Sequence, residues 1–267
     1  MAVCSLPRAL SIAGSVSGGG AGIQADINTF GAFGVFATTA ITAVTVQNTV
    51  GVSGFQEIEA ATVAAQIRAV AEDIGVDAAK TGMLASAPIV DAVAETVAAA
   101  EIPALVVDPV FVSKHGHRLL AEDAVSSLRE RILPIATLVT PNLPEAAELA
   151  GVGAESREDM RRVGERLLEL GAGAVLVKGG HLEGGGADDL FLDGTLEEWL
   201  EAERLATPDT HGTGCVLSAA IAAELARGAE LLDAVRSGKV FVTEAIRHAL
   251  AVGEGIGPVD PLWRNRR

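Results

Sequence analysis

Short apolar runs alternate with helical segments along most of this chain. Strands are predicted at residues 8–13, 36–46, 76–80, 104–108, 136–140 and 174–178, followed by an antiparallel pair at 189–193 and 198–205. Helices are predicted at residues 21–33, 59–73, 87–100, 121–131, 145–150, 156–170, 215–226 and 231–250. This alternation favours parallel strands joined by crossover helices. We therefore expect an α/β fold of three layers, α/β/α, with a mainly parallel central sheet and helices on both faces. Residues 1–267 show no repeat or linker and are predicted to form one domain.

The composition limits the partners and the compartment. The formal net charge is −15, which argues against a surface for nucleic acid or for an anionic membrane. The N-terminus lacks a basic segment followed by an apolar one, and no apolar run is long enough to span a bilayer. We therefore expect a cytoplasmic protein, and an anionic ligand would need local positive features such as a helix N-terminus, a lysine or a metal ion.

Residues 209–215, with the sequence DTHGTGC, form a glycine-containing loop that leads into a small, apolar helix. The first backbone N–H groups of a helix lack intrahelical partners and carry the positive end of the helix dipole, which suits a phosphate. Gly212 and Gly214 allow close approach of the backbone, and Cys215 falls in the first turn, where we expect its pKa to be lowered. The plainer interpretation is a common loop followed by an inert buried cysteine.

Polar or small residues follow nearly every predicted strand. A second glycine loop, at 14–20, lies between a strand and a helix but lacks the lysine of a Walker A loop. The polar residues at or just past strand ends are Gln47, Lys80, Asp108, Thr140, Asn142, Glu145 and Lys178. Each one alone is also compatible with a cap or a turn. Because the carboxyl ends of parallel strands share one edge of a sheet, together they predict a ligand site there.

Seven motifs in series resemble one known family. They are IAGSVSGGGAGIQADINTF, VQNT, KTGML, VVDPV, VTPNLPEA, VLVKGGH and DTHGTGC, in this order. The chain resembles, over residues 8–262, the hydroxymethylpyrimidine/phosphomethylpyrimidine kinases of thiamine synthesis, which belong to the ribokinase superfamily. The resemblance implies a ribokinase-like fold and two phosphorylations by ATP with Mg²⁺. The first acts on 4-amino-5-hydroxymethyl-2-methylpyrimidine and the second on its monophosphate.

The resemblance also implies roles for individual residues. Cys215 would be the base toward the hydroxymethyl oxygen, and the transferring phosphoryl group would be held by the N–H groups of Gly212, Thr213, Gly214 and Cys215 itself. The implied substrate contacts are Gly14, Asp26, Gln47 and Met83. The implied nucleotide contacts are Lys178, Asn142, Thr140 and His211, and the residues implied at Mg²⁺ are Asp108 and Glu145. A homodimer is implied as well.

Two positions depart from the family pattern. Val16 stands where relatives usually carry a polar residue, and Asn28 stands where they usually carry lysine. One hypothesis is that these changes remove a salt bridge and leave the function intact. The other is that they change which substrate is used or weaken the second phosphorylation. The loop that carries His115, His117 and Arg118 either reaches the substrate phosphate or faces solvent, and we expect it to face solvent.

Three other functions stay open at the level of sequence. Some relatives phosphorylate pyridoxal through the same cysteine-bearing loop, so a pyridoxal kinase is the nearest alternative. A catalytically weak pyrimidine-binding protein is supported only by Val16 and Asn28. A redox role that pairs Cys215 with Cys4 is the third.

Overall fold

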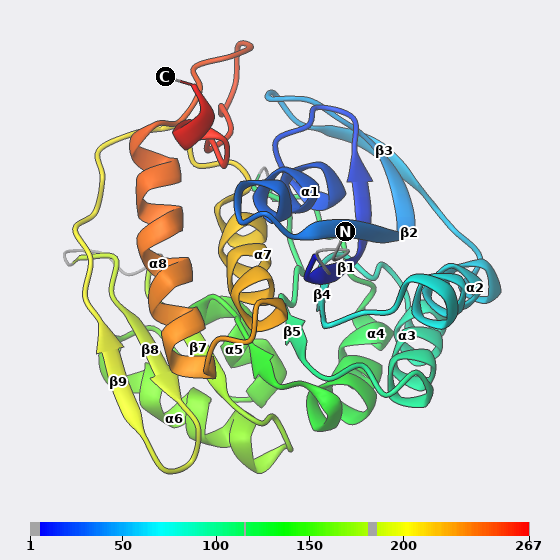
Figure 1. Ribbon diagram of the computed structural model, residues 1–267. Coiled ribbons are helices and arrows are strands. Elements are labelled where there is room, and N and C mark those ends of the chain that lie inside the picture. The colour runs from blue at the N-terminus through cyan, green and yellow to red at the C-terminus, as the bar shows by residue number, and fades with distance from the viewer. Residues whose placement is uncertain (1–5, 115, 181–185, 267) are drawn as a thin grey trace.

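The computed structural model describes residues 6–114, 116–180 and 186–266. Within them, nine strands form one sheet in the order β3-β2-β1-β4-β5-β6-β7-β8-β9 (Figure 1). The strands are β1 Arg8–Val16, β2 Phe36–Gln47, β3 Val52–Glu57, β4 Ala78–Thr81, β5 Leu105–Val107, β6 Leu138–Val139, β7 Val175–Lys178, β8 Asp189–Leu192 and β9 Glu197–Leu200. Neighbours from β2 to β7 are parallel, while β3, β8 and β9 join antiparallel. The predicted mainly parallel sheet is confirmed.

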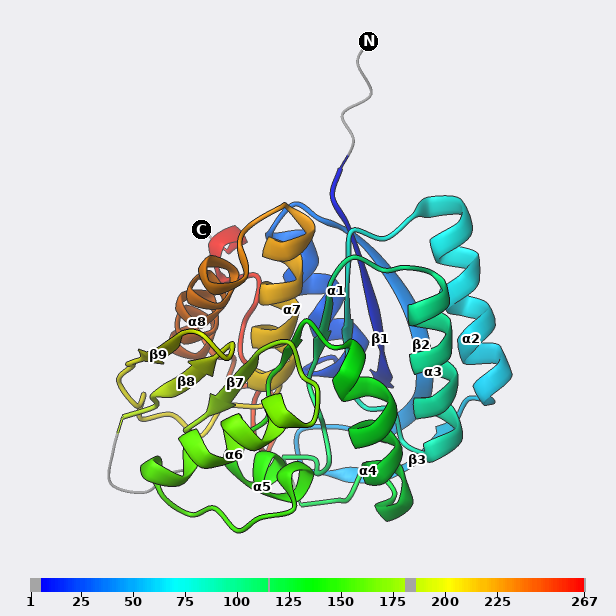
Figure 2. The same cartoon turned by 90° about the horizontal axis from the view of Figure 1, so that it is seen from below.

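Helices cover both faces of this sheet, as predicted. The helices are α1 Gly22–Ala32, α2 Ala60–Ala69, α3 Ala87–Ala99, α4 Glu122–Ser127, α5 Leu143–Ala150, α6 Arg157–Glu169, α7 Thr213–Ala226 and α8 Leu231–Arg247. Helices α1, α7 and α8 lie on one face and α2 to α6 on the other (Figure 2). Each face has its own apolar core, built chiefly from Ala, Val, Leu and Ile. Fully burying one Val, Leu or Ile side chain stabilises the folded state by about 1.5–3 kcal/mol.

Local sequence explains where two of the helices begin. Asn142 caps α5 and Ser156 caps α6, and each side chain accepts a hydrogen bond from the backbone N–H three residues later. The carboxylates of Glu145 and Asp159, at those third positions, accept a hydrogen bond from the backbone N–H of the cap residue. The N-termini of α5 and α6 therefore both form capping boxes. Helix α6 thus begins where it was predicted, next to Ser156, and α5 begins at Leu143, two residues before its predicted start at residue 145.

The structure differs from the prediction most clearly at three strands. Strand β9 ends at Leu200, although the last strand was expected to extend to residue 205. Strand β3 was not predicted, because its sequence VSGFQE contains a glycine and is largely exposed, without a buried alternating face. Strand β1 runs on to Val16, although residues 14–20 were expected to form a loop. Its pairing with β2 shifts register between Ala13 and Ser15, which places the irregularity at Gly14.

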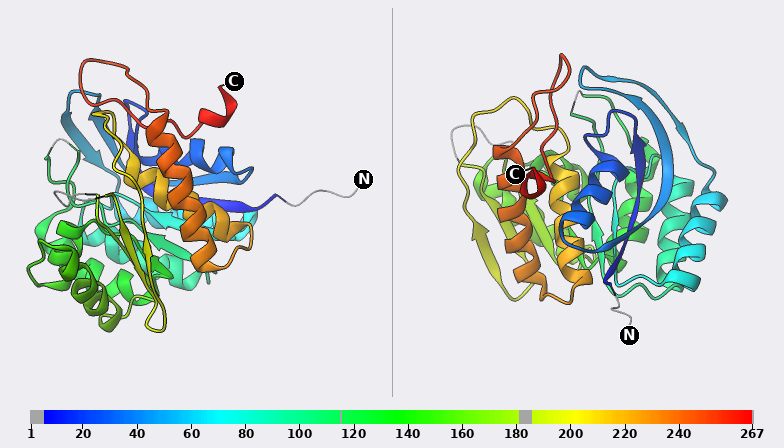
Figure 3. Two further views of the ribbon diagram at one scale, coloured as in Figure 1. Left: turned by 90° about the vertical axis from the view of Figure 1, so that its left-hand side faces the viewer. Right: turned by 45° about the horizontal axis from the view of Figure 1, so that its top comes forward.

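The segment after α8 ties the chain back to the carboxyl edge of the sheet. The Ile256 N–H donates to the Thr49 carbonyl at 2.9 Å, and the His211 N–H donates to the Gly257 carbonyl at 3.1 Å. This C-terminal segment therefore joins the β2–β3 turn to the loop before α7 (Figure 3). None of the helices in the described ranges has the length and apolarity that crossing a membrane would require.

Candidate functional site

A cavity of about 920 Å³ opens at the carboxyl edge of the parallel strands. Residues from the ends of β1, β2, β4, β5 and β7 contribute to its walls, together with the loop before α7. Most of the residues singled out from the sequence line it, namely Gly14, Gln47, Met83, Asp108, Asn142, Glu145, Lys178, His211, Gly212, Thr213, Gly214 and Cys215. The predicted convergence of strand-end residues at one edge is therefore present.

The loop before α7 has the geometry of an anion site. Gly212 caps the helix with a φ of 81°, and a β-carbon there would lie 1.9 Å from the Gly20 carbonyl oxygen, so only glycine fits. The helix begins at Thr213, and no backbone carbonyl in the described residues accepts a bond from the Gly214 or Cys215 N–H. These N–H groups are available to a ligand in the cavity.

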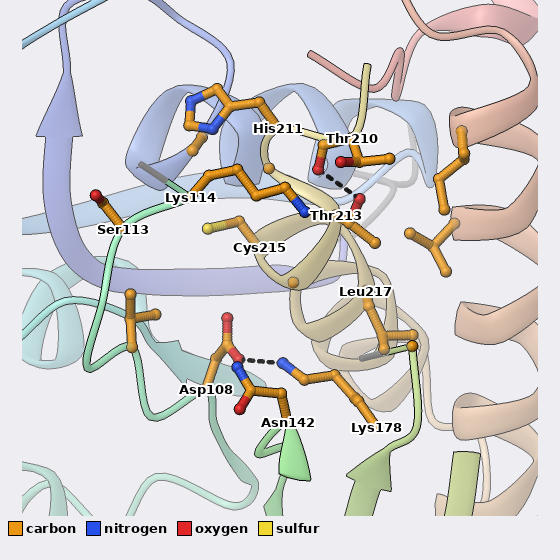
Figure 4. A pocket seen from close by; sticks show the side chains of 18 of the residues that line it. Asp108, Ser113, Lys114, Asn142, Lys178, Thr210, His211, Thr213, Cys215 and Leu217 are labelled. Carbon is orange, nitrogen blue, oxygen red and sulfur yellow. Dashed lines mark hydrogen bonds and ion pairs between the residues drawn. The ribbon is translucent and has the colours of Figure 1, made fainter. Parts of the chain in front are cut away.

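An ion pair faces this loop. The Lys178 ammonium lies 2.9 Å from Asp108 Oδ1, and a β-carbon at Gly214 would lie 3.3 Å from Asp108 Oδ2 and 3.4 Å from Lys178 Nζ. Burial opposes the charge on Lys178, yet the Asp108 and Glu145 carboxylates outweigh it and raise the pKa of Lys178. A positive and a negative group thus stand directly beside the free amides (Figure 4).

Glu145 adds a second carboxyl group beside this pair. It accepts a hydrogen bond from the Asn142 N–H at 2.9 Å, and burial raises its pKa to about 7, with Lys178 acting in the opposite direction. Mg²⁺ prefers oxygen ligands and keeps several waters, so one or two carboxylates with phosphate oxygens are enough for it. Among the described residues no cluster of three or more His, Cys, Asp and Glu side chains forms a metal site. The Asp108 and Glu145 oxygens therefore fit Mg²⁺ bound together with phosphates, but not a protein-only metal cage.

Cys215 differs from its prediction in one respect. Its sulfur faces the cavity in Figure 4 and accepts a hydrogen bond of 3.4 Å from the Gly22 N–H, the first residue of α1. Burial raises the pKa of the thiol to about 11, although the Lys80 charge and the Gly22 bond act in the opposite direction. The expected lowering by the first turn of α7 was wrong, because loss of solvation outweighs those favourable groups.

Asp26 does not reach the cavity, which corrects the prediction that it contacts the substrate. Its side chain is fully buried and lies 3.0 Å from the equally buried Lys80 ammonium. It also accepts a 2.5 Å hydrogen bond from the Ser11 hydroxyl. The physical reason is that a buried lysine needs a counter-ion. A β-carbon at Gly82, on the cavity wall, would lie 3.1 Å from Lys80 Nζ, so this pair sits just behind the wall.

Two residues predicted to contact the nucleotide take other positions: Thr140 lies behind the cavity wall, and His211 lines the cavity beside Gln47. Thr140 is fully buried, and its hydroxyl lies 3.4 Å from the Val107 carbonyl oxygen and 3.3 Å from Asp108 Oδ1, so it supports Asp108 from behind. His211 lines the cavity away from Lys178, with Nε2 at 3.4 Å from Gln47 Nε2. The backbone pairing of His211 with the C-terminal segment fixes it on this side.

The Gln47 side of the cavity carries polar and apolar groups suited to a small ring. Gln47 is fixed at the end of β2 by two hydrogen bonds between its backbone and the Ser17 hydroxyl. The Met83 sulfur would lie 3.2 Å from a β-carbon at Gly14, so Met83 packs over the bulge in β1. Val16 also lines this wall. The Gln47 amide, the Met83 thioether and the Gly14 backbone thus face one part of the cavity, here called the Gln47 compartment.

Sequence reasoning missed two cavity residues, Lys114 and Lys239. The chain has four lysines, and three of them, Lys114, Lys178 and Lys239, line the cavity while Lys80 lies behind its wall. Lys239 is held 2.7 Å from the buried Asp189 carboxylate. The scarcity of lysine was the available signal, because only four of the 20 Lys and Arg residues of the chain are lysine and the others are arginine.

The remaining positions of interest lie outside the cavity or outside the described residues. His117 and Arg118 are exposed, which agrees with the expectation that this part of the loop faces solvent. Asn28 is exposed on α1. His115 and Cys4 fall outside the described residues, so neither the place of His115 nor a pairing of Cys4 with Cys215 is tested.

The chain is similar to known proteins in sequence and in structure. Residues 17–260 match the family described as phosphomethylpyrimidine kinase. A Streptomyces coelicolor protein named hydroxymethylpyrimidine/phosphomethylpyrimidine kinase is 52% identical over 257 residues, which cover 96% of this chain and 95% of the relative. The crystal structure of phosphomethylpyrimidine kinase from Clostridium difficile 630 is 42% identical, with a TM-score of 0.81, and the match covers 91% of this chain and 100% of that one. An ADP complex of Bacillus subtilis pyridoxal kinase is 38% identical with a TM-score of 0.92, covering 98% and 100%.

Proposed function

This chain belongs to the phosphomethylpyrimidine kinase family, and we propose that it phosphorylates 4-amino-5-hydroxymethyl-2-methylpyrimidine with ATP and then phosphorylates the monophosphate, in thiamine biosynthesis. One observation carries the proposal. The Cys215 thiol lies at the free amides of α7, between the Gln47 compartment and the Asp108–Lys178 pair. This arrangement offers an acceptor compartment and a phosphate compartment on either side of one transfer point.

In the first step the hydroxymethyl oxygen bonds to the γ-phosphorus, the bond from that phosphorus to the ADP oxygen breaks, and the hydroxyl proton leaves. A phosphoryl-transfer transition state is loose, so positioning and charge neutralisation matter more than a strong base. With a pKa of about 11 the Cys215 thiol is protonated at neutral pH. We therefore assign it to orienting the hydroxyl by hydrogen bonding and to accepting the proton late in the transfer.

The phosphate compartment supplies the positive groups. The Gly214 and Cys215 N–H groups would hold the transferring phosphoryl group, and Lys178 would contact the nucleotide phosphates. Asp108 and Glu145 would hold Mg²⁺ or its waters, and Mg²⁺ would supply charge neutralisation of the phosphate oxygens. Lys239 stands in the same cavity but is engaged by Asp189, which leaves it to fix the wall on that side.

The acceptor compartment would read the pyrimidine through Gln47 and Met83. An amide side chain both donates and accepts, which matches the amino group and ring nitrogen of an aminopyrimidine. Asp26 has a different role in this proposal: with Lys80 it supplies a fixed pair of charges behind Cys215 without touching the substrate. We also propose His211 as a neighbour of the pyrimidine ring, because it stands next to Gln47.

The structural similarity to a pyridoxal kinase makes pyridoxal the second candidate acceptor. Measuring ADP release with the pyrimidine alcohol and with pyridoxal, side by side and at matched concentrations, separates the two. We expect a higher kcat/KM for the pyrimidine alcohol, and a higher value for pyridoxal would overturn this ranking. Tight binding of the pyrimidine without ADP release would instead indicate a catalytically weak binding protein.

Replacing Cys215 tests the proposed transfer point. Cys215→Ala removes the group that orients the hydroxyl, so we expect kcat for the alcohol to fall by about 10²-fold or more, with little change in its affinity. Steady-state kinetics and calorimetric binding of the alcohol measure the two effects separately. Turnover like that of the wild type in this variant would remove Cys215 from the mechanism.

Three properties of the whole molecule belong to the same proposal. We propose that residues 1–267 act as one ribokinase-like domain, since the strands of the described residues form one sheet. We propose a cytoplasmic homodimer, and the exposed Val44 and Val46 on β2 are apolar side chains that a second copy would cover. Sedimentation at several concentrations decides the oligomeric state, and a monomer throughout would refute the dimer.

A further inference from the structure

Lys114 stands apart from the other three lysines of the chain. Lys80 is bound to Asp26, Lys178 to Asp108 and Lys239 to Asp189, at distances of 3.0, 2.9 and 2.7 Å. Lys114 has no carboxylate and no hydrogen-bond partner in the part of the chain that the structure describes, although it lines the same cavity. A cation without an anion, in a cavity whose other lysines are all neutralised, is available for an anion that the ligand brings.

The position of Lys114 suits a phosphate near the transfer point. The loop that carries it follows β5 and is anchored by Phe111, which is 1% exposed. In Figure 4 the Lys114 side chain extends past Cys215, and its ammonium group points toward Thr213. Lys114 is exposed to solvent, and partial desolvation nevertheless lowers its pKa, with no carboxylate beside it to act in the opposite direction. The chain thus holds a charge without a carboxylate partner among the described residues, beside Cys215 and the start of α7.

We propose that Lys114 binds the phosphate group of the monophosphate acceptor in the second phosphorylation. This inference rests on the proposed function, because it names the residue that adapts the same site to its second substrate. The first acceptor is a neutral alcohol. The second carries a phosphate with a charge of about −1.5 to −2 at neutral pH, which must be placed next to the phosphates of ATP. An additional cation beside the acceptor would offset this charge in the second step.

The chemistry of the two steps separates the roles of Cys215 and Lys114. In the second step an oxygen of the acceptor phosphate bonds to the γ-phosphorus, the bond from that phosphorus to the ADP oxygen breaks, and the diphosphate and ADP result. The attacking oxygen has already lost its proton at neutral pH, because the second pKa of a phosphate monoester is about 6. Removing a proton matters only in the first step, and neutralising the acceptor matters only in the second.

The competing interpretation places Lys114 on the γ-phosphoryl group of ATP in both steps. The nucleotide phosphates already have Lys178 and the free amides of α7 on their side of the cavity. Lys114 comes instead from the loop after β5, and its side chain extends past Cys215 (Figure 4), which the proposed function places at the acceptor oxygen. We therefore favour the acceptor phosphate, and the two interpretations predict different kinetics.

The test compares two acceptors in three variants. Lys114→Gln removes the charge, Lys114→Arg keeps it, and Arg118→Gln removes a charge from the same loop as a matched control. Arg118 is exposed and engaged by Glu148 at 2.8 Å, and it does not line the cavity. For each protein, kcat and KM are measured with the pyrimidine alcohol and separately with its monophosphate, at saturating ATP and Mg²⁺. Calorimetric titration of the monophosphate without nucleotide gives a readout that is independent of turnover.

We expect Lys114→Gln to raise KM and weaken binding for the monophosphate by about tenfold or more, and to change KM for the alcohol by less than about threefold. Lys114→Arg should restore most of the monophosphate affinity, and higher salt should weaken monophosphate binding in the wild type more than in Lys114→Gln. Cys215→Ala should show the reverse pattern, with the larger loss on the alcohol.

Equal losses on both acceptors in Lys114→Gln would assign Lys114 to ATP, and no loss on either would remove it from the site; both results overturn the inference. An effect of Arg118→Gln as large as that of Lys114→Gln would also overturn it, because general loop charge would then explain the data. Failure of the proposed function looks different: the wild-type protein itself would phosphorylate neither acceptor.

Discussion

Two lysine–carboxylate pairs flank the proposed transfer point, and they differ in their access to the cavity. Lys80 and Asp26 lie 3.0 Å apart with both side chains fully buried. Lys178 and Asp108 lie 2.9 Å apart, and the Lys178 side chain is 16% exposed. The same chemistry therefore serves two purposes. The Lys80–Asp26 pair, here called the sealed pair, keeps a fixed charge distribution behind Cys215. The Lys178–Asp108 pair, here called the open pair, is available to phosphates and Mg²⁺.

The origin of the two pairs explains this difference. Asp26 lies on α1 and Lys80 on β4, so their pair is enclosed between a helix and the sheet. Asp108 and Lys178 stand at the carboxyl ends of β5 and β7, where the sheet stops and the cavity begins. A residue's place relative to the end of its strand thus decides whether its charge reaches a ligand.

Breaking the sealed pair should give the largest effect. Lys80→Met leaves the Asp26 carboxylate buried without a counter-ion, so we expect the free energy of unfolding to fall by about 3–5 kcal/mol. Urea denaturation measures it. The double variant Asp26→Asn with Lys80→Met removes both charges and should recover part of the loss. A single variant as stable as the wild type would show that the pair is not sealed in solution.

Breaking the open pair should affect turnover more than stability. Lys178→Met removes a donor that neutralises phosphate charge, so we expect kcat for the alcohol to fall by about 10²–10³-fold, the range seen when one preorganised donor is lost. Steady-state kinetics measure the loss, and Lys178→Arg serves as the matched variant that keeps the charge. Should Lys178→Met retain wild-type kcat, the open pair would have no part in the transfer.

Protonation of Glu145 should modulate the open pair by a smaller factor. Burial raises its pKa to about 7 from an ordinary 4.5, so the fold favours the neutral carboxyl. Its contribution to stability is present below pH 4.5 and is lost as the pH rises through 7. Mg²⁺ needs the charged form, so affinity for Mg²⁺ with an ATP analogue should rise about tenfold between pH 6 and pH 8.

Calorimetric titration of Mg²⁺ with the analogue at those two pH values measures this change. Glu145→Gln is the control, because it cannot titrate and should show only the pH dependence of the nucleotide itself. Identical pH dependence in the wild type and in Glu145→Gln would exclude Glu145 from the metal site.

The sequence allowed the α/β class, nearly all element positions and the cavity edge to be predicted, because period and strand-end chemistry are local properties. It did not reveal which polar side chains are buried away from the cavity. Asp26 and Thr140 lie in the family motifs, as Gln47 and Lys178 do. Only the packing of Asp26 against Lys80 and of Thr140 against Asp108 shows that these two residues are buried behind the cavity. Whether a strand-end side chain faces the core or the cavity depends on three-dimensional packing that no single motif records.

Other features escaped prediction for related reasons. The raised pKa of the Cys215 thiol depends on how strongly the surrounding fold desolvates its sulfur, whereas the motif shows only that a helix starts there. Strand β3 has no buried alternating face, so the pattern that reveals strands was absent. Lys114 belongs to a loop without a regular pattern, and only its lack of a partner inside the cavity distinguishes it.

Phosphorus NMR of the protein mixed with ATP, Mg²⁺ and the pyrimidine alcohol follows both phosphoryl transfers in one sample. We expect a monoester resonance first and a diphosphate pair later, with one ADP formed for each phosphoryl group transferred. ATP left intact, or ADP formed together with free phosphate while the alcohol stays unmodified, would contradict the proposed function.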